Sequence, residues 1–150
     1  MRHKRIWPLM TLFLIGLSLL FVGFCKRNDP GSSDYRELID KTWFLEKIHS
    51  HRGETIQVDR TYSLLINADR SAELIVDCNH CWGTVLFGQG GSIRFSDGLG
   101  CTEVGCGPDS RDSDFYLAID KVFHFKINKG ELYLHFDNLN SYLKFRQLEI

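Results

Sequence analysis

Hydrophobic residues in this chain form one long N-terminal run and then a series of short runs. The long run, Ile6–Phe24, carries no charged side chain and follows the basic residues Arg2, Lys4 and Arg5. A basic segment followed by an apolar one is typical of an export signal. The later runs are rich in β-branched and aromatic residues and are separated by polar turns, a pattern that predicts β-strands.

The spacing of these short runs predicts a mainly β fold with one late helix. We expect a helical turn over Asp34–Leu38 capped by Ser33, and a helix from Ser110 to about Asp120. The predicted strands are Thr42–Ser50, Thr55–Val58, Thr61–Asn67, Ala72–Cys78, Trp82–Phe87, Ser92–Phe95, Val122–Asn128, Glu131–Phe136 and Ser141–Leu148. Strands and helices do not alternate, which makes a parallel sheet unlikely. The predicted fold class is therefore α+β, mainly β: a twisted antiparallel sheet or partly closed barrel with one helix packed against it.

The last hairpin has a register that the sequence can specify. A two-residue turn at Lys129-Gly130 keeps apolar residues opposite one another, whereas a three-residue loop would mix the two faces. The two-residue turn predicts the pairs Ile127–Leu132, Phe125–Leu134 and Phe123–Phe136. The opposite, outward face then carries His124, Lys126, Tyr133 and His135.

Composition and charge indicate a single exported domain. The chain has 150 residues, 43% of them hydrophobic, and 18 basic against 19 acidic residues. This balance leaves no basic excess for nucleic acid, so we exclude that class of partner. We divide the chain into an export signal (1–25), a polar linker (26–41) and a folded domain (42–150). Removing the signal leaves 15 basic and 19 acidic residues, an ordinary soluble surface.

Cys25 stands directly after the apolar run and before the polar linker. This position resembles the start of a bacterial lipoprotein, in which such a cysteine is acylated, although Phe24 stands where a small residue is usual. Cleavage after Cys25 and retention of the run as an anchor are the alternatives. All three place the domain outside the cytoplasm, in the bacterial envelope.

Four further cysteines are left for the folded domain: Cys78, Cys81, Cys101 and Cys106. They permit two disulfides in three connectivities, and export to an oxidising compartment favours disulfides. A nested arrangement, Cys78–Cys106 with Cys81–Cys101, would hold the loop between the last two cysteines against the central strands. The alternatives are a four-thiolate zinc site on the same residues, which in a cytosolic chain would be preferred, and a redox-active Cys78-Asn79-His80-Cys81.

At three of its motifs the chain resembles the META/HslJ family of small bacterial envelope proteins. The motifs are Trp43-Phe44-Leu45-Glu46-Lys47-Ile48, Cys78-Asn79-His80-Cys81-Trp82-Gly83 and Thr102-Glu103-Val104-Gly105-Cys106. The resemblance covers about residues 42–147. It implies an antiparallel sheet with one helix, a Cys78–Cys106 link, frequent lipidation and a role in envelope stress or surface association, without a known catalytic activity. Cys81 and Cys101 are additions to the family pattern.

Catalytic and cofactor motifs are sparse. No serine, Ser141 included, lies in a Gly-x-Ser-x-Gly elbow, and Gly88-Gln89-Gly90-Gly91 lacks the features of a phosphate-binding loop. We therefore predict no enzyme activity and no cofactor. Asp109, Asp112 and Asp114 resemble a cation-binding loop, but no Glu follows at the twelfth position of an EF-hand, so we interpret one of them as the N-cap of the late helix.

Histidines and aromatic residues offer two further possibilities. His124 and His135 face each other across the last hairpin and could ligate a metal, but no third ligand is evident, so a solvated pair is preferred; His49 and His51 are interpreted in the same way. The many aromatic residues could line a lipocalin-like cavity for a small apolar ligand, but the preferred interpretation is that they fill the space between sheet and helix.

The leading hypothesis is a non-enzymatic, exported envelope domain, tethered to the membrane at Cys25 and stapled by two disulfides. It would serve an interaction or stress-protection role, with an envelope protein as a possible partner. An apolar pocket between helix and sheet, and a zinc-stabilised four-cysteine domain, are the alternatives.

Overall fold

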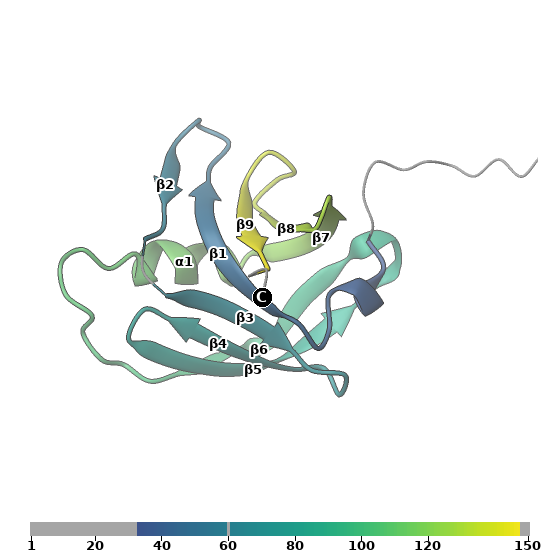
Figure 1. The fold of residues 1–150 in the computed structure, drawn as a ribbon, viewed down its shortest axis with the longest axis horizontal. Coiled ribbons are helices and arrows are strands. Elements are labelled where there is room, and N and C mark those ends of the chain that lie inside the picture. The colour runs from purple at the N-terminus through teal and green to yellow at the C-terminus, as the bar shows by residue number, and fades with distance from the viewer. Residues whose placement is uncertain (1–32, 60, 148–150) are drawn as a thin grey trace, which may run out of the picture.

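The computed structural model describes residues 33–59 and 61–147, which form a nearly closed β-barrel with one short helix (Figure 1). The strands are β1 (Thr42–His49), β2 (Thr55–Gln57), β3 (Tyr62–Ile66), β4 (Ser71–Val76), β5 (Asn79–Phe87), β6 (Ile93–Cys101), β7 (Val122–Asn128), β8 (Glu131–Phe136) and β9 (Tyr142–Arg146). The helices are the 3₁₀ turns η1 (Tyr35–Glu37) and η2 (Gln89–Gly91) and the α-helix α1 (Asp112–Ile119). The predicted fold class is confirmed.

All strand pairs are antiparallel, in the order β6-β5-β4-β3-β1-β9-β8-β7, with β2 paired to the end of β1. In Figure 1 strands β3 to β6 form the lower wall and β1, β9, β8 and β7 the upper one. The two walls meet a second time where Ser92, which directly precedes β6, forms a β-bridge with His124 of β7. This single bridge brings the two edge strands, β6 and β7, together and makes the sheet almost a closed barrel.

The interior is filled by side chains from every wall and from α1. Five large aromatic side chains are fully buried there: Trp43, Tyr62, Phe115, Phe125 and Phe145. The helix contributes Phe115, Ala118 and Ile119 to the same core cluster. These aromatic side chains occupy the space between the walls and α1, which agrees with the preferred interpretation that they fill the core.

The last hairpin has the expected two-residue turn but contains a bulge. Ile127 pairs with Leu132, and Phe125 pairs with Leu134, as predicted. The predicted pair Phe123–Phe136 is wrong, because Val122 takes the position opposite Phe136. Phe123 is the extra residue of the bulge, which interrupts the alternation of inward and outward side chains along β7. The Phe123 side chain is 41% exposed.

Strand β6 is longer than predicted, running to Cys101 instead of ending at Phe95. Thr84 of β5 pairs with Ser96 and Trp82 pairs with Gly100, so three residues of β6 lie opposite Gly83 alone. A bulge of this width breaks the alternation of faces from which a strand is recognised in sequence. Gly98 has φ +75°, a conformation that glycine adopts without strain and that permits this bulge.

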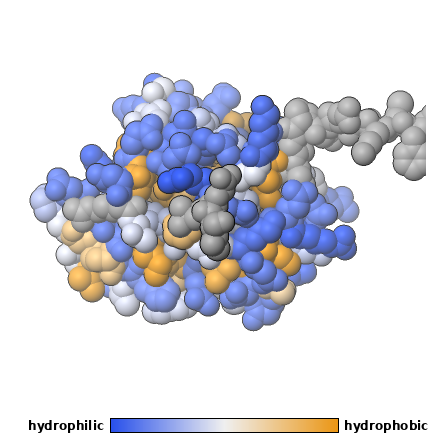
Figure 2. All heavy atoms as spheres, viewed as in Figure 1, coloured by the Kyte–Doolittle hydropathy of each residue, from blue (hydrophilic) through white to orange (hydrophobic). Residues whose placement is uncertain are grey.

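The surface is mostly polar, with scattered hydrophobic residues on the face shown in Figure 2.

The N-terminal turn η1 is capped by the Asp34 side chain, which accepts from the Arg36 amide at 3.0 Å, rather than by Ser33. In the part of the chain that the structure describes, no helix has the length and apolarity to cross a bilayer.

Candidate functional site

One disulfide ties the start of the β5–β6 hairpin to the loop that follows it, and a second links the two strands of the hairpin. Cys78 is bonded to Cys106, and Cys81 is bonded to Cys101. The second pair follows from strand register, because Cys81 and Cys101 are directly opposite one another on β5 and β6. This is the nested arrangement, and in it none of the four sulfur atoms is a thiolate available to zinc. Two disulfides suggest an oxidising, extracytoplasmic location.

Asn79 organises the loop that the first disulfide holds. Its amide nitrogen donates to the Val104 carbonyl at 2.9 Å, and its carbonyl oxygen accepts from the Thr102 hydroxyl at 2.9 Å and from the Val104 amide at 2.8 Å. The side chain is only 4% exposed. The loop after β6 therefore has a fixed conformation set by one buried amide as well as by the Cys78–Cys106 bond.

An apolar cleft of about 290 Å³ lies between α1 and the end of β6. Its apolar walls are Phe95, Leu99 and Cys101 from β6, and Tyr116, Leu117 and Ile119 from α1. Asp120 and Lys121 stand at its polar side. Leu117 is 65% exposed although it belongs to the helix that fills the core, so an apolar side chain is presented to whatever enters the cleft.

Gly83 sets the position of the cleft wall on β6. A Cβ atom at Gly83 would lie 2.7 Å from Leu99 Cδ2, closer than two such carbons approach. Leu99 therefore folds over β5 at the place where a side chain is missing, in the middle of the β5–β6 bulge. The cleft depends on this local combination of a glycine on one strand and a bulge on the other.

Tyr116 connects the cleft to the disulfides. Its hydroxyl lies 3.5 Å from Cys81 Sγ, and burial, with the nearby charge of Asp112, raises the pKa of the phenol. Tyr116 and Cys101 also line a second, more open cleft of about 470 Å³ beside Thr102. A neutral phenol and two oxidised sulfurs form this junction, which suits binding better than proton transfer.

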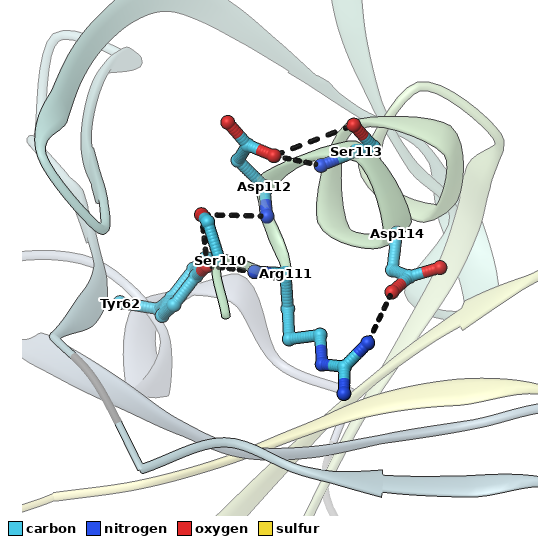
Figure 3. Close-up of polar contacts among 6 residues, drawn as sticks. All are labelled: Tyr62, Ser110, Arg111, Asp112, Ser113 and Asp114. Atoms are coloured by element: carbon cyan, nitrogen blue, oxygen red, sulfur yellow. Dashed lines mark hydrogen bonds and ion pairs between the residues drawn. The ribbon is translucent and has the colours of Figure 1, made fainter. Parts of the chain in front are cut away.

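The backbone amides at the N-terminus of α1 donate to hydroxyl groups that the sequence did not indicate (Figure 3). The Tyr62 hydroxyl, from β3, accepts from the Arg111 amide at 2.9 Å, and the Ser110 hydroxyl accepts from the Asp112 amide at 3.3 Å. The position before the helix is Arg111, which makes no side-chain cap. The expectation of an aspartate cap is therefore wrong: Asp112 lies inside the first turn, where its carboxylate accepts from the Ser113 amide at 2.6 Å.

Asp114 also belongs to that first turn and lies 3.9 Å from the Arg111 guanidinium. Both groups are about half exposed, so this contact contributes little to stability. Acidic residues in the first turn complement the helix dipole, which accounts for their place in the sequence.

The outward face of β7 and β8 carries the expected polar and aromatic side chains. His124 and His135 are directly opposite one another, with ring centroids 5.7 Å apart. Burial lowers the pKa of both imidazoles below the usual value for histidine. Burial and the hydrogen bond to Glu131 raise the pKa of Tyr133 to about 12.

The histidines at the end of β1 have structural roles. His49 Nδ1 lies 2.7 Å from the Thr55 hydroxyl, and the His49 ring stacks on Tyr142 at 4.9 Å. The Ser141 hydroxyl accepts from the His51 amide at 2.9 Å and is itself fully buried. A buried serine that already holds a backbone amide is not placed to attack a substrate.

The proposed lipid attachment residue, Cys25, lies outside the described residues. The cleft residues Leu99 and Leu117 were not singled out from sequence, since Leu99 stands between two glycines and Leu117 is a single leucine within the predicted helix. The available signals were Gly98, which interrupts the strand pattern, and an apolar residue at position 117 off the face that Phe115 and Ile119 share.

Comparison with known proteins is decisive for the family. The model of the META domain matches residues 36–149, which is most of the chain. The chain belongs to the META domain family. The resemblance seen at the three sequence motifs is thereby confirmed.

Solved structures share the fold of this META domain protein. An NMR structure of a protein from Burkholderia xenovorans has a TM-score of 0.66 and 21% identity, covering 81% of this chain and 92% of that one. The crystal structure of a DUF4847 family protein from Bacteroides vulgatus has a TM-score of 0.59 and 12% identity, covering 77% and 98%. No curated protein matches the sequence. At these identities the likeness concerns the fold alone.

Proposed function

We propose that this META domain protein is a non-enzymatic binding domain of the bacterial envelope, tethered to the membrane by a lipid on Cys25. The apolar cleft between α1 and β6 carries the proposal, because it is a concave apolar surface held rigid on one side by the Cys81–Cys101 disulfide. Such a domain would act by association at the membrane surface, in an interaction or stress-protection role.

Several features support binding rather than catalysis. The walls of the cleft are apolar apart from Tyr116, and its charged groups, Asp120 and Lys121, lie only at its polar side. Leu117 and Leu99 supply contact area on opposite walls, which is the usual composition of a site that recognises an apolar side chain or a short acyl group.

The leading occupant is an apolar side chain of an envelope protein. The second candidate is a small apolar molecule, which the volume of about 290 Å³ favours over a whole lipid. In either case the ligand would lie beside the barrel, since the interior is filled by core residues.

Two leucines allow a matched test of the cleft. Leu117 lines the cleft and is 65% exposed, whereas Leu139, in the β8–β9 turn, is 61% exposed and lies elsewhere. We expect Leu117→Ser to reduce uptake of a fluorescent apolar probe by about tenfold, the loss of one buried leucine contact, while Leu139→Ser leaves it unchanged. Equal effects of both substitutions, or no uptake by the parent protein, would refute binding in the cleft.

Tethering and export are tested separately. Growth with a radioactive fatty acid should label the parent protein and not the Cys25→Ser variant, and an unlabelled parent would remove the tether. Alkylation of the denatured, unreduced residues 26–150 should leave all four domain cysteines unmodified. Four alkylated thiols would contradict the disulfides and bring the zinc alternative forward.

A further inference from the structure

The outward, polar face of β7 and β8 carries a cross-strand pair of imidazoles. His124 on β7 and His135 on β8 are direct partners in the ladder, and both project outward because Phe125 and Leu134 beside them are buried in the core. Their ring centroids are 5.7 Å apart with 38° between the planes. Directly opposed residues on neighbouring strands bring their side chains within contact distance.

This spacing suits one ion shared by two rings. A transition metal bound to imidazole lies about 2.0–2.1 Å from the nitrogen and hence roughly 3 Å from the ring centre. Two rings on one ion therefore have centres about 5–6 Å apart, which is the spacing in this protein. The separation of the ring centres therefore matches that of two imidazoles on one ion.

One nitrogen of the pair has an unmet bonding capacity. His135 Nδ1 is buried, and although the backbone of Leu139 and Ser141 lies near the ring, this nitrogen makes no well-aligned hydrogen bond among the described residues. A buried polar atom left without a partner costs about 1–3 kcal/mol, so such atoms in folded proteins usually mark a bound water, ion or ligand. A metal ion would satisfy this nitrogen.

Both rings are held by their neighbours. Gly91 lies against His124 so closely that a Cβ atom there would be 2.7 Å from the His124 Cε1, and Ser92 bridges to the His124 backbone. The His135 ring packs edge-on to Tyr142 at 6.2 Å. Packing of this kind fixes ring orientation before a ligand arrives, which lowers the entropic cost of binding.

We propose that His124 and His135 form a binding site for a divalent first-row transition metal such as Zn²⁺, each supplying one imidazole nitrogen, with water completing the coordination. Imidazole ligands select this class over Mg²⁺ and Ca²⁺, which prefer oxygen. Residues 33–59 and 61–147 contain no group of three or more His, Cys, Asp or Glu side chains placed on one ion, so the site is a two-ligand one. It is independent of the cleft and of the proposed function.

Lys126 provides an internal check on the proposal. It shares the outward face with the two histidines, on β7, and its positive charge acts on both rings. A cation at the pair is repelled by this ammonium group. Lys126→Gln should therefore bind the metal several-fold more tightly than the parent.

The test is a titration of the full chain, in detergent and with ¹⁵N-labelled histidine, with ZnCl₂ followed by NMR of the imidazole nitrogens. Site-resolved signals separate this pair from every other histidine, His3 included. We expect the His124 and His135 signals to move together with a dissociation constant below about 100 μM. His124→Asn and His135→Asn should each weaken binding at least about tenfold, whereas His80→Asn, a histidine on β5, should bind as the parent does.

Two results would overturn the site: ring signals of His124 and His135 that do not move at about 1 mM Zn²⁺, or an asparagine variant that binds like the parent. A variant that fails to fold leaves the parent titration and the Lys126→Gln comparison to decide. Neither result bears on uptake of an apolar probe by the cleft, so the two proposals fail separately.

Discussion

The buried amide of Asn79 is the most informative single position for the stability of the disulfide-bonded loop. Replacing it with alanine removes the hydrogen bonds to the Val104 amide, the Val104 carbonyl and the Thr102 hydroxyl. A net hydrogen bond is worth about 1 kcal/mol, so three of them amount to about 3 kcal/mol. Val104 is 57% exposed, and water can replace part of what its backbone loses. We therefore expect Asn79→Ala to lower the free energy of unfolding by about 2–3 kcal/mol.

The assay is urea unfolding at equilibrium with both disulfides intact, so that the loop stays covalently closed in folded and unfolded chains. Thr102→Val removes the bond to Asn79 and also the bond that the Thr102 hydroxyl accepts from the His80 amide at 3.0 Å, so it should cost about 2 kcal/mol. Thr102→Ser keeps the hydroxyl and serves as the matched control. The double variant Asn79→Ala/Thr102→Val should be destabilised by less than the sum of the two single costs, because both substitutions remove the hydrogen bond between Asn79 and Thr102. An Asn79→Ala protein within about 0.5 kcal/mol of the parent would refute the assignment of the loop's order to this amide.

Three further predictions concern other parts of the barrel. Replacing the Cys81–Cys101 disulfide by two alanines should lower the free energy of unfolding by about 3 kcal/mol, measured by urea unfolding, since its cysteines are 20 residues apart; an unchanged midpoint would contradict this. Gly83→Ala should push Leu99 out of the cleft wall, so that apolar-probe uptake falls strongly while the melting temperature falls only slightly. Unchanged uptake with a large drop in melting temperature would show that Gly83 does not set the position of this wall. The hydrogen bond from Lys144 lowers the pKa of Glu131 below 4.5, so the stability this carboxylate contributes is present above pH 4.5 and lost as pH falls through the lowered value. Glu131→Gln should then be less sensitive to acid than the parent below pH 4.5, and parallel pH profiles of the two proteins would exclude this contribution.

Local patterns account for the parts of the fold that were predicted well. The turn at Lys129-Gly130 could be placed because its flanking strands alternate apolar and polar residues over their whole length, and only one register keeps the apolar residues together. Failures begin where alternation stops. Phe123 was paired wrongly because a bulge adds one residue to β7, and nothing in its own identity signals that change.

Features that depend on distant parts of the chain were out of reach of local reasoning. The cap of α1 comes from Tyr62, a strand residue 49 positions away from Arg111, so no neighbouring residue could indicate it. The pairing of Cys81 with Cys101 follows from the β5–β6 register, which in turn depends on a bulge opposite Gly83. The cleft also depends on this bulge, because Leu99, which forms part of the cleft wall, lies in it.

The pairing of the first long strand with the last has a consequence for how the protein matures. Most strands pair with a neighbour in sequence, but β1 pairs with β9, so Phe44 finds its partner Arg146 about a hundred residues later. A chain that crosses a membrane N-terminus first delivers β1 early and β9 last. The β3–β6 meander and its Cys81–Cys101 bond can form during passage, whereas β1 keeps one edge open until Tyr142–Arg146 emerges. Loss of the final strand would therefore leave a disulfide-bonded half-barrel with an exposed strand edge, which is a template for pairing with other chains.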